Sequence, residues 1–179
     1  LMVTGDKDEE GIRHMVEVSF KAMESGRAVS SQVYTYDDQR IVPFISQDEA
    51  LLERVASLEH LLLQGNYHAQ KEQLDTIHEE QKTDVFVATY KLFELKDSNG
   101  KTFSMCSWTE TVDTLLPKTD RVALVQIQPD GTAQTQVVEW DELETKLGDL
   151  LAPASLYPAR YRTLGFPTAA QLSQLTPLV

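Results

Sequence analysis

The chain has 179 residues, of which 41% are hydrophobic and 25% are charged, and this composition is typical of one globular domain rather than a disordered segment. It carries 16 Lys and Arg against 28 Asp and Glu, so its formal net charge is −12. Such a charge repels phosphate backbones and anionic lipid headgroups, and we therefore expect neither nucleic acid nor a membrane surface as a partner.

Two amphipathic patterns predict helices near the N-terminus. Between residues 6 and 25 apolar side chains recur at steps of three and four, after an acidic cluster that favours a helix start, and Gly26 can end the helix. Between residues 48 and 63 a second apolar stripe follows, and Ser46 and Glu49 have the spacing of a capping box.

The sequence predicts a break after the second helix. Gly65 and Asn66 interrupt the apolar stripe. Residues 67–82 resume helical spacing, but beyond Leu74 and Ile77 they carry few apolar side chains. Both an exposed helix and a partly ordered arm fit this stretch.

Three pairs of β-rich segments flank polar turns and predict hairpins. The pairs are residues 31–36 with 40–45, 84–95 with 101–109, and 121–127 with 134–140. Asn99 and Gly100 form the strongest of the turn signals, because both residues tolerate positive φ. Pro43 cannot donate a ladder hydrogen bond and therefore predicts an edge strand.

The C-terminal part predicts a short helix from 141 to 151 and a turn-rich tail from 153 to 179, with a further short helix from 168 to 175. These elements together predict a single α+β domain over residues 1–179, in which the tail packs on the rest. We expect a mainly antiparallel sheet, built from β-hairpins and packed against two or more helices.

No catalytic or cofactor motif is present. The sequence has neither a Gly-x-Ser-x-Gly elbow nor a phosphate-binding glycine loop, so no cofactor is predicted and the catalytic residues stay unknown. Several carboxylates follow predicted strands, and two of them could face each other as an acid and base pair, although helix capping and solvation are the simpler explanation. They are Glu110, Asp113, Glu139, Asp141 and Glu142.

Histidine and cysteine residues give no clear site. His68 and Glu72 are four residues apart and would share a helix face, but they match no zinc motif, and no metal site is predicted. Cys106 falls on the strand face of Ser104 and Trp108 with no histidine nearby in sequence, which predicts a buried structural thiol.

Targeting signals are equally sparse. The single cysteine excludes an internal disulfide and is typical of a reducing compartment. No apolar run approaches the roughly 18 residues of a membrane span, and residues 1–10 show no signal-peptide pattern. These observations predict a cytoplasmic location.

The most distinctive local feature is an aromatic and basic segment in the tail. Its candidate interface residues are Tyr157, Arg160, Tyr161, Arg162 and Phe166. The two arginines are the only charged residues between 150 and 179, and Tyr and Arg are enriched at binding hot spots. Alternatively, the segment folds back on its own acidic body, its arginines pairing with carboxylates and its aromatic rings filling a groove.

Three hypotheses for function follow. The first is a non-enzymatic binding or accessory module that acts through protein–protein contacts. The second is a small enzyme whose carboxylates or histidines assemble only in the fold. The third is a homodimer that pairs through residues 67–82 or a bare sheet edge. A deep cleft with converging ionisable groups would favour the enzyme, and a flat tyrosine-rich face would favour recognition.

Overall fold

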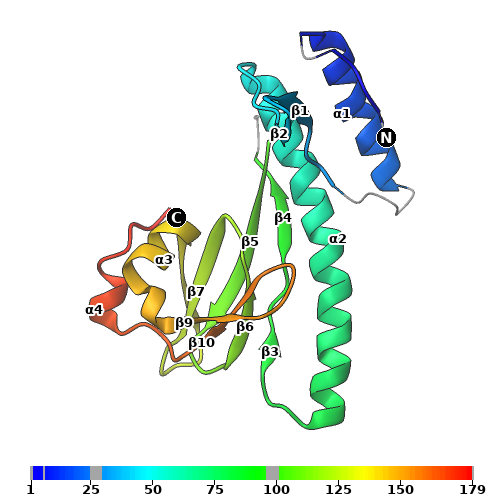
Figure 1. Ribbon diagram of the computed structural model, residues 1–179. Coiled ribbons are helices and arrows are strands. Elements are labelled where there is room, and N and C mark those ends of the chain that lie inside the picture. The colour runs from blue at the N-terminus through cyan, green and yellow to red at the C-terminus, as the bar shows by residue number, and fades with distance from the viewer. Residues whose placement is uncertain (1, 6, 25–29, 96–100, 179) are drawn as a thin grey trace. The chain divides into compact units, whose positions relative to one another are not determined.

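The computed structural model describes residues 2–5, 7–24, 30–95 and 101–178, and in these residues it contains four α-helices and ten strands (Figure 1). The strands form mixed, mainly antiparallel sheets packed against helices, so the α+β class is confirmed. The chain divides into two compact units. The N-terminal unit comprises the described residues of Leu1–Leu63 and Glu94–Thr102, and the C-terminal unit those of Gln64–Phe93 and Phe103–Val179. The expectation of a single domain stays a prediction.

The N-terminal unit begins with α1 (Glu9–Glu24), followed by a hairpin of β1 (Tyr34–Asp37) and β2 (Arg40–Pro43). Both predictions are confirmed, whereas Gly26 lies outside the described residues. Asp38 and Gln39 connect the strands with φ angles of 40° and 61°, and two consecutive positive φ values match the twist of a tight hairpin.

Side chains from α1 and the following helix form a small buried cluster in the N-terminal unit. The buried members are Ile12, Val16 and Leu51, and Met15, Phe20, Val33, Phe44 and Val55 pack against them. Arg54 covers the edge of this cluster, because its guanidinium lies 3.6 Å from the centre of the Phe20 ring while its Nε donates to Glu17 at 2.7 Å. The cluster is therefore shielded on one side by a charged pair.

Helix α2 (Glu49–Gln81) is continuous through Gly65, so the predicted break is wrong (Figure 1). One glycine costs a helix only about 1 kcal/mol, and the burial of Tyr67 half a turn further on favours the helical path. The predicted capping box is also absent. Instead Ser46 Oγ accepts from the Asp48 N–H at 3.0 Å, and Asp48 Oδ1 accepts from the Ala50 N–H at 3.1 Å. The residue directly before α2 is therefore Asp48 and not Ser46.

Two four-stranded sheets, ordered β3-β6-β10-β9 and β4-β5-β7-β8, belong to the C-terminal unit, apart from the end residues Glu94 of β4 and Thr102 of β5, which are assigned to the N-terminal unit. The first consists of β3 (Phe86–Val87), β6 (Thr114–Pro117), β10 (Arg160–Thr163) and β9 (Leu151–Ala154). The second consists of β4 (Lys91–Glu94), β5 (Thr102–Thr109), β7 (Arg121–Ile127) and β8 (Ala133–Glu139). β3 pairs with β6 and β5 with β7 in parallel, whereas β6–β10, β9–β10 and β7–β8 are antiparallel.

The sequence predicted these sheets only in part. The β7–β8 hairpin is confirmed, with Arg121 opposite Glu139. The stretch 84–95 is not one strand, because β3 and β4 belong to different sheets. The predicted turn at Asn99 and Gly100 lies outside the described residues.

Helix α3 (Trp140–Leu147), the 3-10 turn Gly148–Leu150 and α4 (Ala169–Leu172) complete the C-terminal unit. Both helices confirm the expected positions, and Thr168 caps α4 in a capping box with Gln171. The core joins α3 to both sheets. It includes Trp108, Leu116, Val122, Leu124, Val138, Trp140, Leu143 and Leu147.

Candidate functional site

Arg160 is buried inside the C-terminal unit, with 0% of its surface exposed. Its Nε donates to Gln70 Oε1 at 2.6 Å, and its Nη1 donates to the carbonyl oxygens of Ala88 at 2.8 Å and Leu115 at 3.0 Å. Its guanidinium also lies 5.2 Å from the centre of the Tyr67 ring. Desolvation lowers the pKa of Arg160 to about 10, so the side chain stays charged at neutral pH. In this structure Arg160 therefore connects β10 to α2, β6 and the segment after β3.

Two aromatic members of the candidate interface pack against the core of the C-terminal unit. The Tyr161 ring lies 5.2 Å from the Trp140 ring, and the Phe166 ring meets the Trp108 ring edge-on at 5.7 Å. These contacts are those of a segment folded back on its own chain. Tryptophan rings attract them because offset or edge-on aromatic pairs are favourable.

The remaining two candidates are solvent-accessible. Arg162 Nη2 lies 2.6 Å from Asp113 Oδ2 in an exposed ion pair, which raises the pKa of Arg162 through that hydrogen bond. Tyr157 is 90% exposed. Of the five candidates, Tyr157 offers the largest free surface to a partner. The interface predicted from the five residues stays a prediction.

Four of the five carboxylates considered as an acid and base pair contact separate partners. Asp141 has none among the hydrogen bonds of the described residues. Glu110 accepts from the Ile127 N–H, Asp113 pairs with Arg162, Glu139 with Arg121, and Glu142 with Lys146 and Thr176. Lys146 holds the pKa of Glu142 below its usual value, so that carboxyl is a poor proton donor at neutral pH. The pairs anchor loops and strand ends.

Cys106 is buried, and Thr119 Oγ1 donates to its sulfur at 3.4 Å. Burial raises the pKa of its thiol to about 12, so the nucleophilic thiolate is scarce at neutral pH. His68 is exposed, with Nε2 3.5 Å from Glu72 Oε1. Among the described residues, no three His, Cys, Asp or Glu side chains gather as a metal site would require.

The sequence did not predict one contact that a histidine makes. His60 Nδ1 lies 2.8 Å from Thr102 Oγ1, and the Thr102 hydroxyl lies 3.4 Å from Ser57 Oγ. The two partners are separated by 42 residues in the chain, so no local pattern could reveal the pair. None of these residues lines either cavity described below.

A cavity of about 680 Å³ lies entirely within the N-terminal unit. Its floor is buried and includes Ile12, Val16 and Leu58. Its rim includes Tyr36 and Ile41, whose side chains are 73% and 74% exposed. The described lining contains no Asp, Glu, His, Lys, Arg or Cys side chain. The cavity is thus suited to hold a molecule, and among its described lining residues only tyrosine could transfer a proton.

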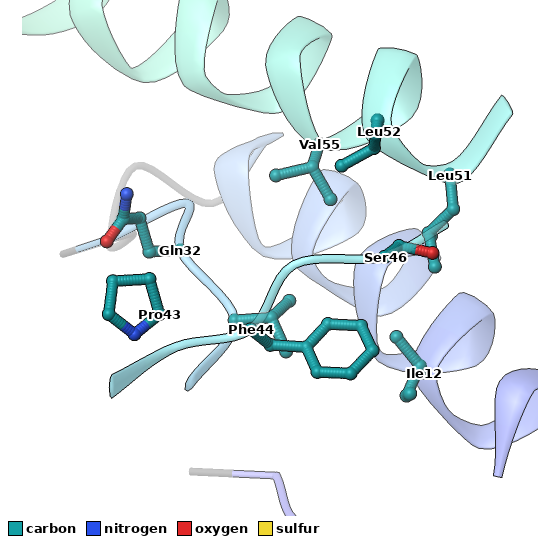
Figure 2. A pocket seen from close by; sticks show the side chains of 9 residues that line it. Ile12, Gln32, Pro43, Phe44, Ser46, Leu51, Leu52 and Val55 are labelled. Atoms are coloured by element: carbon teal, nitrogen blue, oxygen red, sulfur yellow. The ribbon is translucent and has the colours of Figure 1, made fainter. Parts of the chain in front are cut away.

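Figure 2 shows a second, smaller cavity beside it, where the Phe44 ring points toward Ile12 of α1 while Leu52 and Val55 approach from α2. Its volume is about 60 Å³, which holds a few water molecules at most. Phe44 and Ile12 line both cavities, so the two share a wall.

The β1–β2 hairpin presents apolar side chains on one face. Tyr36 lies opposite Ile41 and Tyr34 lies opposite Pro43, and alternation along the strands puts all four on the same side, with Ile45 continuing the row. We name these five residues the hairpin face. Ile45 is 81% exposed. The β-rich pattern predicted the hairpin, but strand periodicity does not tell which side a helix will cover.

No protein-family model, curated protein or solved structure gives a significant match to the chain. Among the described residues, none of the helices combines the length and the apolar character needed to cross a membrane. The choice between binding and catalysis therefore depends on the geometry of these surfaces.

Proposed function

We propose that this protein is a non-enzymatic binding or accessory module that acts through protein–protein contacts. The observation that carries the proposal is the hairpin face, where Tyr36 and its cross-strand neighbour Ile41 are 73% and 74% exposed, and Ile45, further along the same row, is 81% exposed. A contiguous apolar patch on a protein surface marks an interaction site more often than single exposed residues do. The partner is another protein or a second copy of the chain.

The contrast with an enzyme supports this choice. Active sites bring titratable side chains with perturbed pKa values together in a cleft. Here the largest described cavity is lined by apolar and hydroxyl groups, whereas the strongly shifted pKa values belong to Tyr67, Cys106 and Arg160, which are buried in packed surroundings of the other unit. A tyrosine-bearing, apolar face is what recognition requires.

The test compares a hairpin variant with a matched control. Tyr36→Ser combined with Ile45→Ser removes two exposed apolar side chains, and Phe86→Ser combined with Ile127→Ser removes two from the C-terminal unit, where they are 52% and 44% exposed. Each protein is studied by light scattering for self-association and by capture from an extract of the native host. We expect a complex with the wild type and the control that the hairpin variant loses, at an unchanged melting temperature.

Two outcomes would contradict the proposal. One is a wild-type protein that remains monomeric and captures nothing reproducibly. The other is a hairpin variant that retains the same complex as the control, because the partner would then contact another surface.

A further inference from the structure

We propose that the larger cavity of the N-terminal unit is a binding site for an uncharged, apolar small molecule, which would enter past Tyr34, Tyr36 and Ile41, the residues that the cavity shares with the hairpin face. The volume of about 680 Å³ falls within the range of roughly 300–1,000 Å³ that is usual for small-molecule sites. The floor residues Ile12, Val16 and Leu58 are at most 3% exposed, so a ligand that reaches them leaves water.

The absence of charge in the described lining sets the ligand class. A carboxylate or ammonium group inside the cavity would meet no oppositely charged side chain among the lining residues that the structure describes. Burying an ion without such a partner is strongly unfavourable, whereas an alkyl or aryl group gains free energy as its surface leaves water. From the described lining we infer that the cavity favours neutral molecules.

The polar groups of the lining limit how polar the ligand can be. The Ser19 hydroxyl donates to the Met15 carbonyl at 2.8 Å, and Ser30 Oγ accepts from the Gln32 N–H at 3.1 Å. The Thr4 hydroxyl donates to a carboxylate of its own segment. Because the Thr4 and Ser19 hydroxyls donate within the chain and the floor is apolar, we infer a ligand that is mostly hydrocarbon. Hydroxyl or carbonyl groups on that ligand would meet the other polar side chains of the lining, such as Ser31, Gln32 and Tyr36.

Methionine methyl groups provide a direct readout. Met2 and Met15 line the cavity, whereas Met23 and Met105 do not. In protein with ¹³C-labelled methionine methyl groups, titration with 1-decanol should shift the Met2 and Met15 resonances saturably and leave Met105, in the C-terminal unit, unchanged. Shifts that fail to saturate below about 1 mM, or that include Met105 equally, would overturn the proposal.

The charge of the probe tests the ligand class on the wild-type protein itself. We expect decanoate and decylammonium to bind at least about tenfold more weakly than 1-decanol, because their charged ends cannot be buried in the uncharged lining. Equal affinities for the three probes would show that the cavity does not select neutral molecules, and would overturn the proposal.

A filling variant tests the position of the site. Ser19→Leu adds a larger side chain to the cavity from α1, and leucine is at least as compatible with a helix as serine is. We expect this variant to lose about tenfold or more in decanol affinity. His14→Leu is the control, because His14 is an exposed residue of the same helix outside the lining. Equal weakening in both variants, or none in Ser19→Leu, would contradict the proposal, and neither result bears on protein capture by the hairpin face.

Discussion

The two units of the chain use apolar side chains differently. The C-terminal unit buries both tryptophans among side chains from two sheets and α3, and even the charged Arg160 is enclosed and hydrogen-bonded there. In the N-terminal unit the buried cluster of the described residues is smaller and is built around Ile12, Val16 and Leu51, beside a large cavity and an exposed apolar hairpin face.

This difference separates stability from recognition. The C-terminal unit holds the larger buried core, so it is the part that we expect to determine the free energy of unfolding. Incomplete packing costs stability and leaves apolar surface for a partner or ligand to cover. We therefore expect the C-terminal unit to supply most of the stability and the N-terminal unit to supply the binding surface, and the following predictions test that division.

The largest effect is expected from Arg160→Ala in the C-terminal unit. The substitution leaves Gln70 and the carbonyl groups of Ala88 and Leu115 without their donor and opens a hole between strands. We expect the free energy of unfolding to fall by about 3–5 kcal/mol in urea denaturation. The control is Arg162→Ala, whose exposed ion pair contributes little. A similar midpoint for both variants would show that Arg160 does not hold the sheet.

A smaller effect is expected from Val16→Ala, which removes two methyl groups from the N-terminal cluster and should cost about 1–3 kcal/mol. Fluorescence from Trp108 and Trp140 reports only the C-terminal unit, whereas circular dichroism also detects α1. If residues 1–179 form one domain, as we predict, both signals shift to the same midpoint. A shift in ellipticity at an unchanged fluorescence midpoint would instead show two units that unfold separately.

A pH-dependent effect is expected from the Cys106 thiol. Burial raises its pKa from 9.0 to about 12, so the folded protein retains a proton that the unfolded chain releases. This contribution is fully present below pH 9 and decreases as the pH rises toward 12, by about 1 kcal/mol between pH 9 and 10. Two other buried groups change the free energy of unfolding mainly above pH 10, and their effects oppose each other. Burial raises the pKa of Tyr67 to about 12, so stability falls as the pH rises, whereas burial lowers the pKa of Arg160 to about 10, so stability rises.

The measurement for that prediction is the urea midpoint of the wild type and Cys106→Ala at pH 8, 9 and 10. We expect the variant to be less stable at pH 8 and the gap to narrow at pH 10. Parallel curves would mean that the thiol does not titrate with unfolding.

The sequence predicted the elements whose signals are local. The apolar spacing of α1 and α3, and the turn between β7 and β8, all lie within short windows of sequence and were found. β6 was missed because its four residues are all buried, so no alternation of apolar and polar side chains appears. β9 and β10 were missed because the prolines around them favoured turns, and the parallel β5–β7 pair joins strands that no tight turn connects.

The hairpin face and the larger cavity could not be predicted from the sequence, because both depend on contacts between distant segments. The hairpin was found, but which of its faces stays uncovered depends on where α1 and α2 pack. The cavity combines residues from Met2 to Leu58 that share no motif. In the tail, Arg160 and Arg162 are two residues apart on β10, so strand alternation gives them the same side of the strand and cannot distinguish them. Arg160 is nevertheless buried, because Gln70 of α2 and the carbonyl groups of Ala88 and Leu115 surround it, whereas Arg162 pairs with Asp113 in solvent.

The smallest effect is expected from Gly65→Ala in α2. The sequence suggested a break here, yet the structure continues the helix, and a β-carbon at this position would meet no atom within 4 Å. Alanine restricts the unfolded chain and favours helix, so we expect stability to rise by about 0.5–1 kcal/mol, measured as an increased urea midpoint. Gly131→Ala is the opposing control, because a φ of +82° strains a side chain there. A destabilised Gly65→Ala would indicate that glycine is required for a non-helical turn at that point, and α2 would then be two helices.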